Sequence, residues 1–272
     1  MFITAALFPF LFGVAFCFSN RNTVQVKHKG ATTMDNLRLG DEVLVVPSSN
    51  GNEDAIYEPV YSFGHHSDLQ QADFLQLLPS KLELSIDHMV FVENRGAIPA
   101  SMVQVGDKLF GGEEVTAIEM VRRNGVYAPF TRTGEITVNG VKASCYGSLQ
   151  NASSHLMMGS VKTILSMQWL AHRFNVPHRI WCDYFSTCKT ESSTEGGIST
   201  WIAWHLEVAR WCLRQHLVVR WVLLLPLLIV TLILLAALEL LLEYPVAVVM
   251  SVSVLIAFSK RGAGEEDLVY GW

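Results

Sequence analysis

Hydrophobic positions along the chain fall into three stretches with different patterns. Residues 2–16 form an uncharged apolar run, and polar residues 19–22 follow it directly. A run of this length fits a secretory h-region better than a membrane span, and Gly13 and Ala15 supply small residues where signal peptidase reads them. We therefore expect a signal peptide or a signal anchor over residues 1–16.

The second stretch, residues 17–150, alternates between apolar and polar positions over short distances. Typical runs are Thr23–Val26, Leu82–Ile86 and Ile136–Val138, and Gly, Asn, Asp and Pro separate them. A period of two with frequent turn residues predicts short strands joined by tight turns. This region is therefore expected to be a compact all-β domain.

An internal repeat with a constant offset of 66 positions runs through this β domain. The matched blocks are Thr23–Val26 with Met89–Val92, Lys29–Ala31 with Arg95–Ala97, and Leu37–Asp41 with Val103–Asp107. Nothing is inserted between the blocks, and each Gly-Asp pair is typical of a turn before a new strand. The repeat predicts a duplicated β subdomain with pseudo-twofold symmetry.

Residues 151–215 differ from the β domain because they are rich in aromatic residues, Met and His. Their partly helical spacing predicts a helical extension, which fits both a helix lying on a membrane and one packed on the β domain. Within it, the Ser and Gly residues of Lys189–Thr200 predict a flexible connector.

The third apolar stretch covers residues 216–260 and is followed by a polar tail, 261–272. Trp221–Leu238 is long enough to cross a bilayer, with Arg220 at one end and Glu239 at the other. Val246–Phe258 is short for an independent span and fits a second crossing, a re-entrant segment or a hairpin arm. A pair of helices in a soluble core is the alternative for the whole stretch.

The overall composition agrees with a membrane-held protein. Half of the 272 residues are hydrophobic, 17% are charged, and the mean hydropathy is +0.30. A net charge of −5 without a basic cluster argues against nucleic acid as a partner. Five cysteines in a chain of this length do not form a disulfide scaffold.

Cys17 stands between the apolar leader and the first predicted strand, and three interpretations fit it. A lipid-modified cysteine needs a small preceding residue, and Phe16 is large. A buried or disulfide-bonded cysteine is the generic alternative. The third interpretation is a nucleophile that attacks the carbonyl of its own preceding residue, with acyl transfer through a thioester.

Such a nucleophile needs a proton donor for the departing nitrogen and groups that hold the scissile amide. Ser85 and His88 lie three residues apart at the end of a predicted strand and are candidates; a surface histidine beside a turn-forming Asp87 is the alternative. Cys145, near the end of the β domain, supplies a second thiol. It is compatible with a disulfide to Cys17 and with a place in the same site.

Several motifs occur in the order and spacing of the Hint module. They are Cys17-Phe18, Leu39–Asp41, Phe63–His66, Leu84–Val90, Val105–Asp107, Gly125–Pro129 and Ser144–Tyr146. The sequence resembles the autoprocessing (Hog) region of Hedgehog proteins and of Hog-like proteins of protists. The resemblance covers about residues 16 to 150 and implies a pseudosymmetric, horseshoe-shaped, all-β Hint fold.

The resemblance also implies self-cleavage. Cys17 would perform an N-to-S acyl shift on the bond after Phe16, His88 would protonate the leaving nitrogen, and Ser85 would hold the scissile amide where the family usually has Thr. His65 occupies the place of the acid that activates the sterol hydroxyl in Hedgehog proteins, so a sterol and water are both candidates for the second nucleophile. Membrane lipid and the chain's own N-terminal segment are the expected partners.

We expect neither a cofactor nor a metal. The histidines and cysteines after residue 150, such as His172, His178, Cys182 and Cys188, fit no standard zinc spacing. A Cys182–Cys188 disulfide is the simpler interpretation.

Two classes of function follow from the sequence. The first is a membrane-anchored, self-processing Hint domain in the secretory pathway, with the β domain on the lumenal side; Hedgehog-like proteins carry a signalling domain ahead of the nucleophile, whereas residues 1–16 stand there in this sequence. The second is a catalytically inert, membrane-tethered β domain that binds a partner or has a structural role. Thiol-dependent cleavage before Cys17 distinguishes the two.

Overall fold

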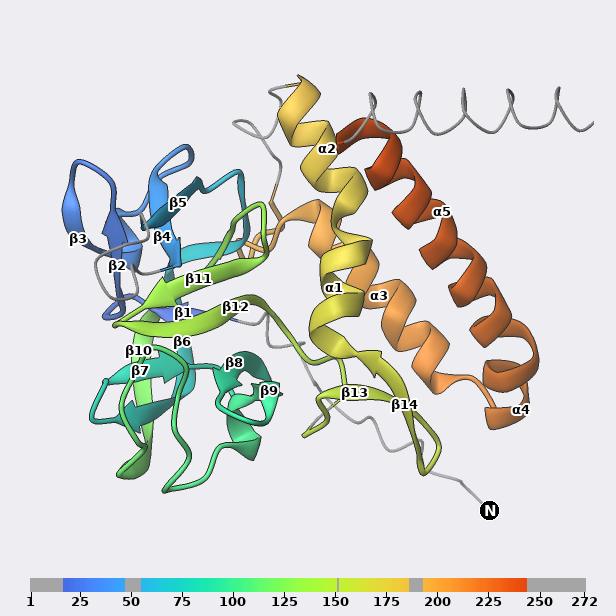
Figure 1. Cartoon of the computed structure of the whole chain (residues 1–272), viewed down its shortest axis with the longest axis horizontal. Helices are drawn as coiled ribbons and strands as arrows, with labels where there is room; N and C mark the ends of the chain where they lie inside the picture. The colour runs from blue at the N-terminus through green and yellow to red at the C-terminus, as the bar shows by residue number, and fades with distance from the viewer. Residues whose placement is uncertain (1–16, 47–54, 151, 186–192, 244–272) are drawn as a thin grey trace, which may run out of the picture.

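The computed structural model describes residues 17–46, 55–150, 152–185 and 193–243, so the expected leader, the second apolar run and the polar tail lie outside the described residues. A β domain occupies one side of the molecule, and helices stand beside it (Figure 1). The strands of the β domain are β1 (Phe18–Ser19), β2 (Thr23–Val26), β3 (Gly30–Thr33), β4 (Glu42–Val46), β5 (Ile56–Pro59), β6 (Ser62–Leu78), β7 (Leu82–Leu84), β8 (His88–Val92), β9 (Gly96–Pro99), β10 (Ala117–Phe130), β11 (Glu135–Val138) and β12 (Val141–Gly147).

The β domain has two sheets. β1, β10, β6 and β7 form a closed barrel, and the other sheet has the order β5-β4-β2-β11-β12-β8-β9, with β3 paired to β2. The long strands β6 and β10 pair along most of their length in an antiparallel ribbon. The expected all-β architecture of residues 17–150 is therefore confirmed.

The duplication expected from the sequence is visible in the backbone. β2, β3 and the 3-10 helix η1 (Met34–Asn36) recur as β8, β9 and η2 (Ala100–Met102) at the same offset of 66 positions. Both hairpins turn through a residue with positive φ at the matched site, His28 (φ 65) and Asn94 (φ 62). Asparagine and histidine are among the residues that tolerate this region best.

The core of the β domain is continuous between the two repeated units. Its residues come from strands of both units, and Phe18, Leu84 and Ile136 are all fully buried. Their packing removes apolar surface from water, which is the main stabilising contribution in a domain of this size. Cys17 directly precedes this buried β1 strand, so the core fixes its backbone.

The region after residue 150 contains a β-hairpin before its helices. The elements are β13 (His155–Met158), β14 (Val161–Ser166), α1 (Met167–Phe174), α2 (Val176–Phe185), α3 (Thr200–Arg214), α4 (Leu217–Val219), the π-helical turn η4 (Arg220–Leu224) and α5 (Leu225–Glu243). The expectation of an entirely helical extension is therefore wrong for residues 155–166, where Gly159 with φ 68 reverses the chain between two paired strands. Cys182 is disulfide-bonded, and Cys188 lies outside the described residues.

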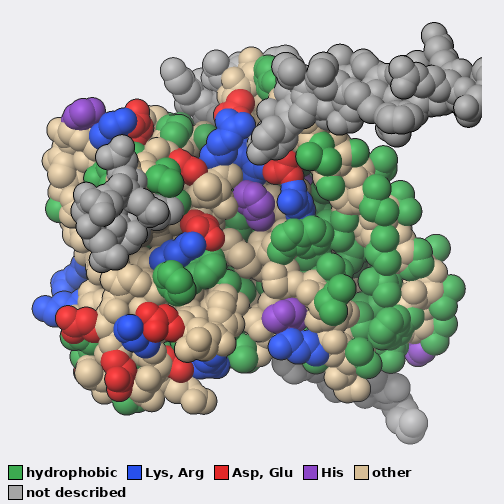
Figure 2. Space-filling model, viewed as in Figure 1, with side chains coloured by type: hydrophobic (Ala, Val, Ile, Leu, Met, Phe, Trp, Pro, Cys, Tyr) green, Lys and Arg blue, Asp and Glu red, His purple; other side chains and the backbone are tan. Residues whose placement is uncertain are grey.

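The helices pack against the β domain through a small apolar cluster. Met89 of β8, Leu170 of α1 and Leu232 of α5 are buried together. Residues Leu217–Leu242 form a helix that is long and apolar enough to cross a membrane, with only 6% of its most apolar window buried. Hydrophobic side chains gather over this side of the molecule, whereas charged side chains are scattered over the β domain (Figure 2).

Candidate functional site

Cys17 is the centre of the candidate site. It lies immediately before β1, whose Phe18 pairs with Tyr127 of β10 and with Leu84 of β7. Its side chain is 1% exposed and packs with Phe74, Val126 and Ala128. Removal from water disfavours the thiolate, so burial raises the pKa of the Cys17 thiol. The thiol is therefore neutral at physiological pH unless a base takes its proton.

Two hydrogen bonds join Cys17 to Ser85. The Cys17 amide N–H donates to Ser85 Oγ at 3.1 Å, and the Ser85 N–H donates to the Cys17 carbonyl at 3.0 Å. Ser85 follows β7 and is itself 1% exposed. The hydroxyl thus contacts the nitrogen of the peptide bond that joins residues 16 and 17.

His65, on β6, provides a base at the thiol. Its Nδ1 lies 3.2 Å from Cys17 Sγ, and its Nε2 lies 2.7 Å from the carbonyl oxygen of Gly196. A carbonyl only accepts hydrogen bonds, which assigns the proton to Nε2 and leaves the Nδ1 lone pair toward the thiol. Burial lowers the pKa of His65, so the neutral, proton-accepting form is favoured.

His88 begins β8 and is fully buried. A turn with His88 N–H donating to the Ser85 carbonyl at 2.9 Å brings it next to Ser85, and its ring lies 4.2 Å, centroid to centroid, from the Phe18 ring. Nε2 donates to the Ser144 carbonyl at 2.8 Å. The spacing of Ser85 and His88 therefore corresponds to a turn between β7 and β8, and the alternative of a surface histidine is wrong.

Cys145, on β12, is a buried free thiol, as is Cys17. The proposed alternative of a Cys17–Cys145 disulfide is therefore wrong. Cys145 Sγ lies 3.4 Å from Thr131 Oγ1, whose proton is donated to the Glu135 carbonyl. Burial raises the pKa of Cys145 to about 12, so this thiol donates to the threonine oxygen and is not ionised.

Comparison with known proteins identifies the family. A family model described as the Hint module matches residues 11–214, three quarters of the chain. This chain belongs to the Hint family. Its membership supports autoprocessing as the general class of activity.

Curated relatives of this Hint chain include Warthog protein 8 of Caenorhabditis elegans, with 27% identity over 216 residues, covering 71% of this chain and 36% of the relative. Protein hedgehog of Drosophila virilis is 27% identical over 180 residues, 60% of this chain and 37% of the relative. The chain thus spans about a third of the length of these relatives. Among solved structures, a bacterial intein-like domain from Clostridium thermocellum covers 47% of this chain and 97% of its own, with 19% identity and a TM-score of 0.39.

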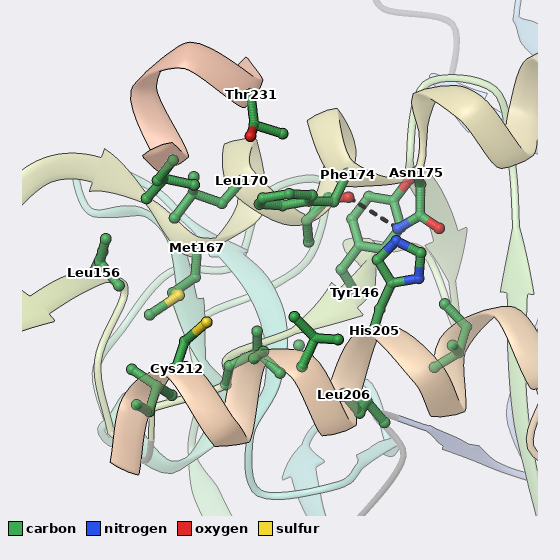
Figure 3. Close-up of a pocket in the computed structure, with 18 of the residues that line it drawn as sticks. Tyr146, Leu156, Met167, Leu170, Phe174, Asn175, His205, Leu206, Cys212 and Thr231 are labelled. Carbon is green, nitrogen blue, oxygen red and sulfur yellow. Dashed lines mark hydrogen bonds between the residues drawn. The ribbon is translucent and has the colours of Figure 1, made fainter. Parts of the chain in front are cut away.

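An apolar cavity of about 350 Å³ lies between the Hint β domain and the helices. Gly64 and Ala128 line one part of it, and these residues neighbour His65, since Ala128 pairs with His65 across the sheet. Figure 3 shows Met167 of α1 and Cys212 of α3 pointing toward one another. An apolar cavity therefore lies next to the strand segment that carries the candidate base.

The sequence did not indicate the contribution of residues 193–199 to this site. The connector expected to be flexible is paired with β6 through an antiparallel bridge between His65 and Ile198. Gly and Ser residues indicated flexibility, and no local pattern revealed which strand this segment meets. Within the described ranges, no group of three or more potential ligands suited to a metal ion occurs.

Proposed function

We propose that this chain cleaves its own backbone before Cys17 by an N-to-S acyl shift. The observation that carries the proposal is the placement of Cys17, which has a base 3.2 Å from its sulfur and a hydroxyl 3.1 Å from its amide nitrogen. A buried neutral thiol with a neutral imidazole oriented toward it is the arrangement that nucleophilic catalysis requires.

In the first step, His65 Nδ1 takes the thiol proton as Cys17 Sγ attacks the carbonyl carbon of residue 16. The C–S bond forms, the peptide C–N bond breaks, and the Cys17 nitrogen receives a proton from His88 in its protonated form. The product is a thioester between residue 16 and Cys17, with a free amine on Cys17. His65 then holds the thiol proton and His88 has lost one proton to the amine, so charge and protons balance.

Ser85 acts on the departing nitrogen. Its Oγ accepts the Cys17 N–H, so it holds this nitrogen in place while the sulfur approaches. Fixing the reacting groups in this geometry removes much of the entropic cost of the acyl shift. Cys17, Ser85 and His65 touch the reacting atoms, whereas Cys145 borders the cavity next to them.

The second step transfers the acyl group from sulfur to an alcohol. The apolar cavity that begins at Gly64 and Ala128 suits a sterol or another lipid alcohol, whose hydroxyl would reach His65 from that side. Proton exchange with solvent first returns His65 to its neutral form and His88 to its protonated form. His65 then accepts the hydroxyl proton as the oxygen attacks the thioester carbonyl, the C–S bond breaks, and the same proton passes from His65 to the Cys17 sulfur, which leaves as the thiol. Hydrolysis by water is the competing outcome.

Attachment of the chain to a membrane would favour a lipid alcohol as the acceptor of the acyl group. The Leu217–Leu242 helix is apolar and mostly exposed, which suits a span of the bilayer from which a lipid could enter. We place the β domain on the lumenal side, where the Asn151-Ala152-Ser153 sequon is a substrate for glycosylation. Loss of apparent mass on endoglycosidase treatment tests this orientation, and an unglycosylated chain with protease-sensitive cytosolic epitopes contradicts it.

Thiolysis of the full chain in detergent tests the first step. Dithiothreitol and hydroxylamine should each release a peptide ending at Phe16, as measured by mass spectrometry. Cys17→Ala should remain intact, and Cys17→Ser should form an oxygen ester that hydroxylamine cleaves and dithiothreitol does not. Cleavage of Cys17→Ala to the same extent as the wild type contradicts the proposal. An intact wild-type chain favours the inert binding module.

The acceptor is identified by the mass of the released peptide. The full chain is incubated in phosphatidylcholine vesicles with and without cholesterol, without added thiol. A peptide heavier by one sterol less one water supports transfer to the lipid. A peptide with a free carboxylate under both conditions shows that water is the acceptor.

A further inference from the structure

Residues 193–199, here called the clasp, are hydrogen-bonded to the strand that carries His65. The His66 N–H donates to the Gly197 carbonyl at 2.9 Å, and the Ser199 N–H donates to the Gly64 carbonyl at 3.0 Å. These bonds flank His65 on both sides, and the β-bridge between His65 and Ile198 lies between them. The clasp therefore forms a short additional edge on β6 at the candidate base.

The conformation of the clasp is fixed by its own turn. The Gly197 N–H donates to the Thr194 carbonyl at 2.8 Å, and the Thr194 N–H donates to the Ile198 carbonyl at 2.8 Å. Gly197 has φ +80, and a Cβ at this position would lie 2.3 Å from the His66 carbonyl oxygen. Only glycine fits there, for both backbone conformation and close approach.

Two contacts join the clasp to the reacting groups. The Gly196 carbonyl accepts from His65 Nε2 at 2.7 Å, and Ile198 packs against the cluster formed by Cys17, Phe74 and Ala128. The first contact determines which imidazole nitrogen bears the proton, because the partner of one ring nitrogen sets the state of the other. The second contact covers the cluster in which the thiol is buried.

We infer that the clasp is a positioning element of the autoprocessing site: the Gly196 carbonyl holds the His65 imidazole with its unprotonated Nδ1 at the Cys17 thiol. This inference rests on the proposed function. It assigns part of the site to the helical extension, since α3 begins at Thr200, directly after the clasp. Folding of the extension onto β6 is thus required for an efficient first step.

Gly197 and its exposed neighbour Glu195 provide a test with a control in the same turn. Gly197→Ala places a methyl group against the His66 carbonyl and should displace the clasp. Glu195→Ala removes an exposed side chain and leaves the backbone hydrogen bonds of the clasp to β6 in place. The two variants therefore differ mainly in whether the clasp stays docked.

Cleavage by dithiothreitol is measured for the full chain in detergent from pH 5 to 9. Gly197→Ala should slow cleavage near neutral pH by about ten-fold or more, the effect of losing one buried hydrogen bond to the base. The rise of its cleavage rate with pH should also shift to higher pH, because without an oriented imidazole the thiol must ionise unaided. Glu195→Ala should retain the wild-type rate and profile.

A smaller perturbation covers the possibility that Gly197→Ala misfolds. Thr194→Val removes the hydroxyl that accepts the Ile198 N–H at 3.2 Å, keeps the side-chain shape, and should shift the profile in the same direction by a smaller amount. A wild-type profile in both Gly197→Ala and Thr194→Val overturns the inference. A uniform loss of rate at every pH in the folded variants also overturns it, since this indicates a structural effect only.

The state of His65 is also measured without cleavage, so that failure of the proposed function remains distinguishable. In Cys17→Ala protein labelled with ¹⁵N-histidine, the His65 signals are assigned by their loss in His65→Gln. The proton should stay on Nε2 in the Glu195→Ala background and exchange between the two ring nitrogens in the Gly197→Ala background. Identical ¹⁵N shifts in the two backgrounds contradict the inference even where the wild-type chain fails to cleave.

Discussion

The two repeated units of the β domain share a backbone but not a chemistry. In the first unit the Asp41 N–H donates to the Arg38 carbonyl at 3.1 Å, and in the second the Asp107 N–H donates to the Gln104 carbonyl at the same distance. Corresponding ion pairs also recur, Lys29–Asp41 and Arg95–Asp107. The frame of each unit is therefore set by turns and hydrogen bonds that repeat at the offset of 66.

The residues just before each unit differ in what they do. Ser19 and Asn22 occupy the first copy of the positions that Ser85 and His88 occupy in the second. Asn22 accepts from the Glu83 N–H at 3.0 Å and donates to the Glu83 carbonyl at 2.7 Å, so its amide completes the hydrogen bonding of β7. The comparison shows that one frame holds a structural amide in the first copy and the candidate proton donor in the second.

Replacing His88 or Asn22 by alanine should give the largest difference between the catalytic role and the structural role. His88→Ala should reduce thiol-dependent cleavage by about 100-fold or more, the usual contribution of a general acid. Asn22→Ala should instead lower the free energy of unfolding by about 1–3 kcal/mol, because it leaves buried Glu83 backbone groups unpaired. Denaturant titration measures the free energy of unfolding of each variant. Cleavage rates are then compared at a temperature where both variants are folded. Comparable losses of cleavage in both would break the comparison.

A second effect is the pH dependence of cleavage, which the His65 base dictates. Because burial lowers its pKa, His65 stays neutral at neutral pH and becomes protonated only as the pH falls through the lowered value. The first-step rate should therefore fall only on the acid side of the ordinary histidine range, and no fall from protonation of His65 should occur at neutral pH. Rates measured under saturating hydroxylamine test this, and an unchanged acid limb in His65→Gln would show that another group titrates.

Ser85 and Ser19 form a matched pair with a smaller expected difference. Ser85→Ala removes the acceptor of the Cys17 N–H and should slow cleavage by about ten-fold, and Ser85→Thr should restore most of the rate because it keeps the hydroxyl. Ser19→Ala alters a bond to Glu83 and should leave the rate close to that of the wild type. A Ser85→Ala rate equal to that of Ser19→Ala would remove Ser85 from the site.

The smallest effect concerns a surface ion pair whose charges are exchanged between the copies. Lys27 Nζ lies 2.8 Å from Glu42 Oε2, and Lys108 Nζ lies 3.0 Å from Glu93 Oε1 at the corresponding positions. The double change Lys27→Glu and Glu42→Lys should alter the free energy of unfolding by less than about 0.5 kcal/mol, since both groups are partly exposed. A larger loss, measured by denaturant titration, would show that the first copy requires its own charge order.

Much of the β domain could be predicted from local patterns. The repeat, the alternation and the turn residues indicated the strands around Thr23–Val26 and Met89–Val92, because strand and turn preferences are local. The hairpin β13–β14 was missed because its Leu, Met and Ile residues at mixed spacing also fit a helix. Cys17, Ser85 and His88 were identified through motif spacing, and the turn that joins Ser85 to His88 explains why that spacing is informative.

The sequence by itself determined the two-unit β frame, the candidate nucleophile and the apolar helix, because each depends on residues close together in the chain or on an exact repeat. Only the tertiary structure decided what surrounds the nucleophile. It separates Cys17 and Cys145 into two free thiols and brings the Gly196 carbonyl to His65, 131 residues away in the chain. Such contacts depend on how the extension folds back onto β6. This docking is set by buried area and by backbone hydrogen bonds between distant segments, and neither produces a periodic pattern in the sequence.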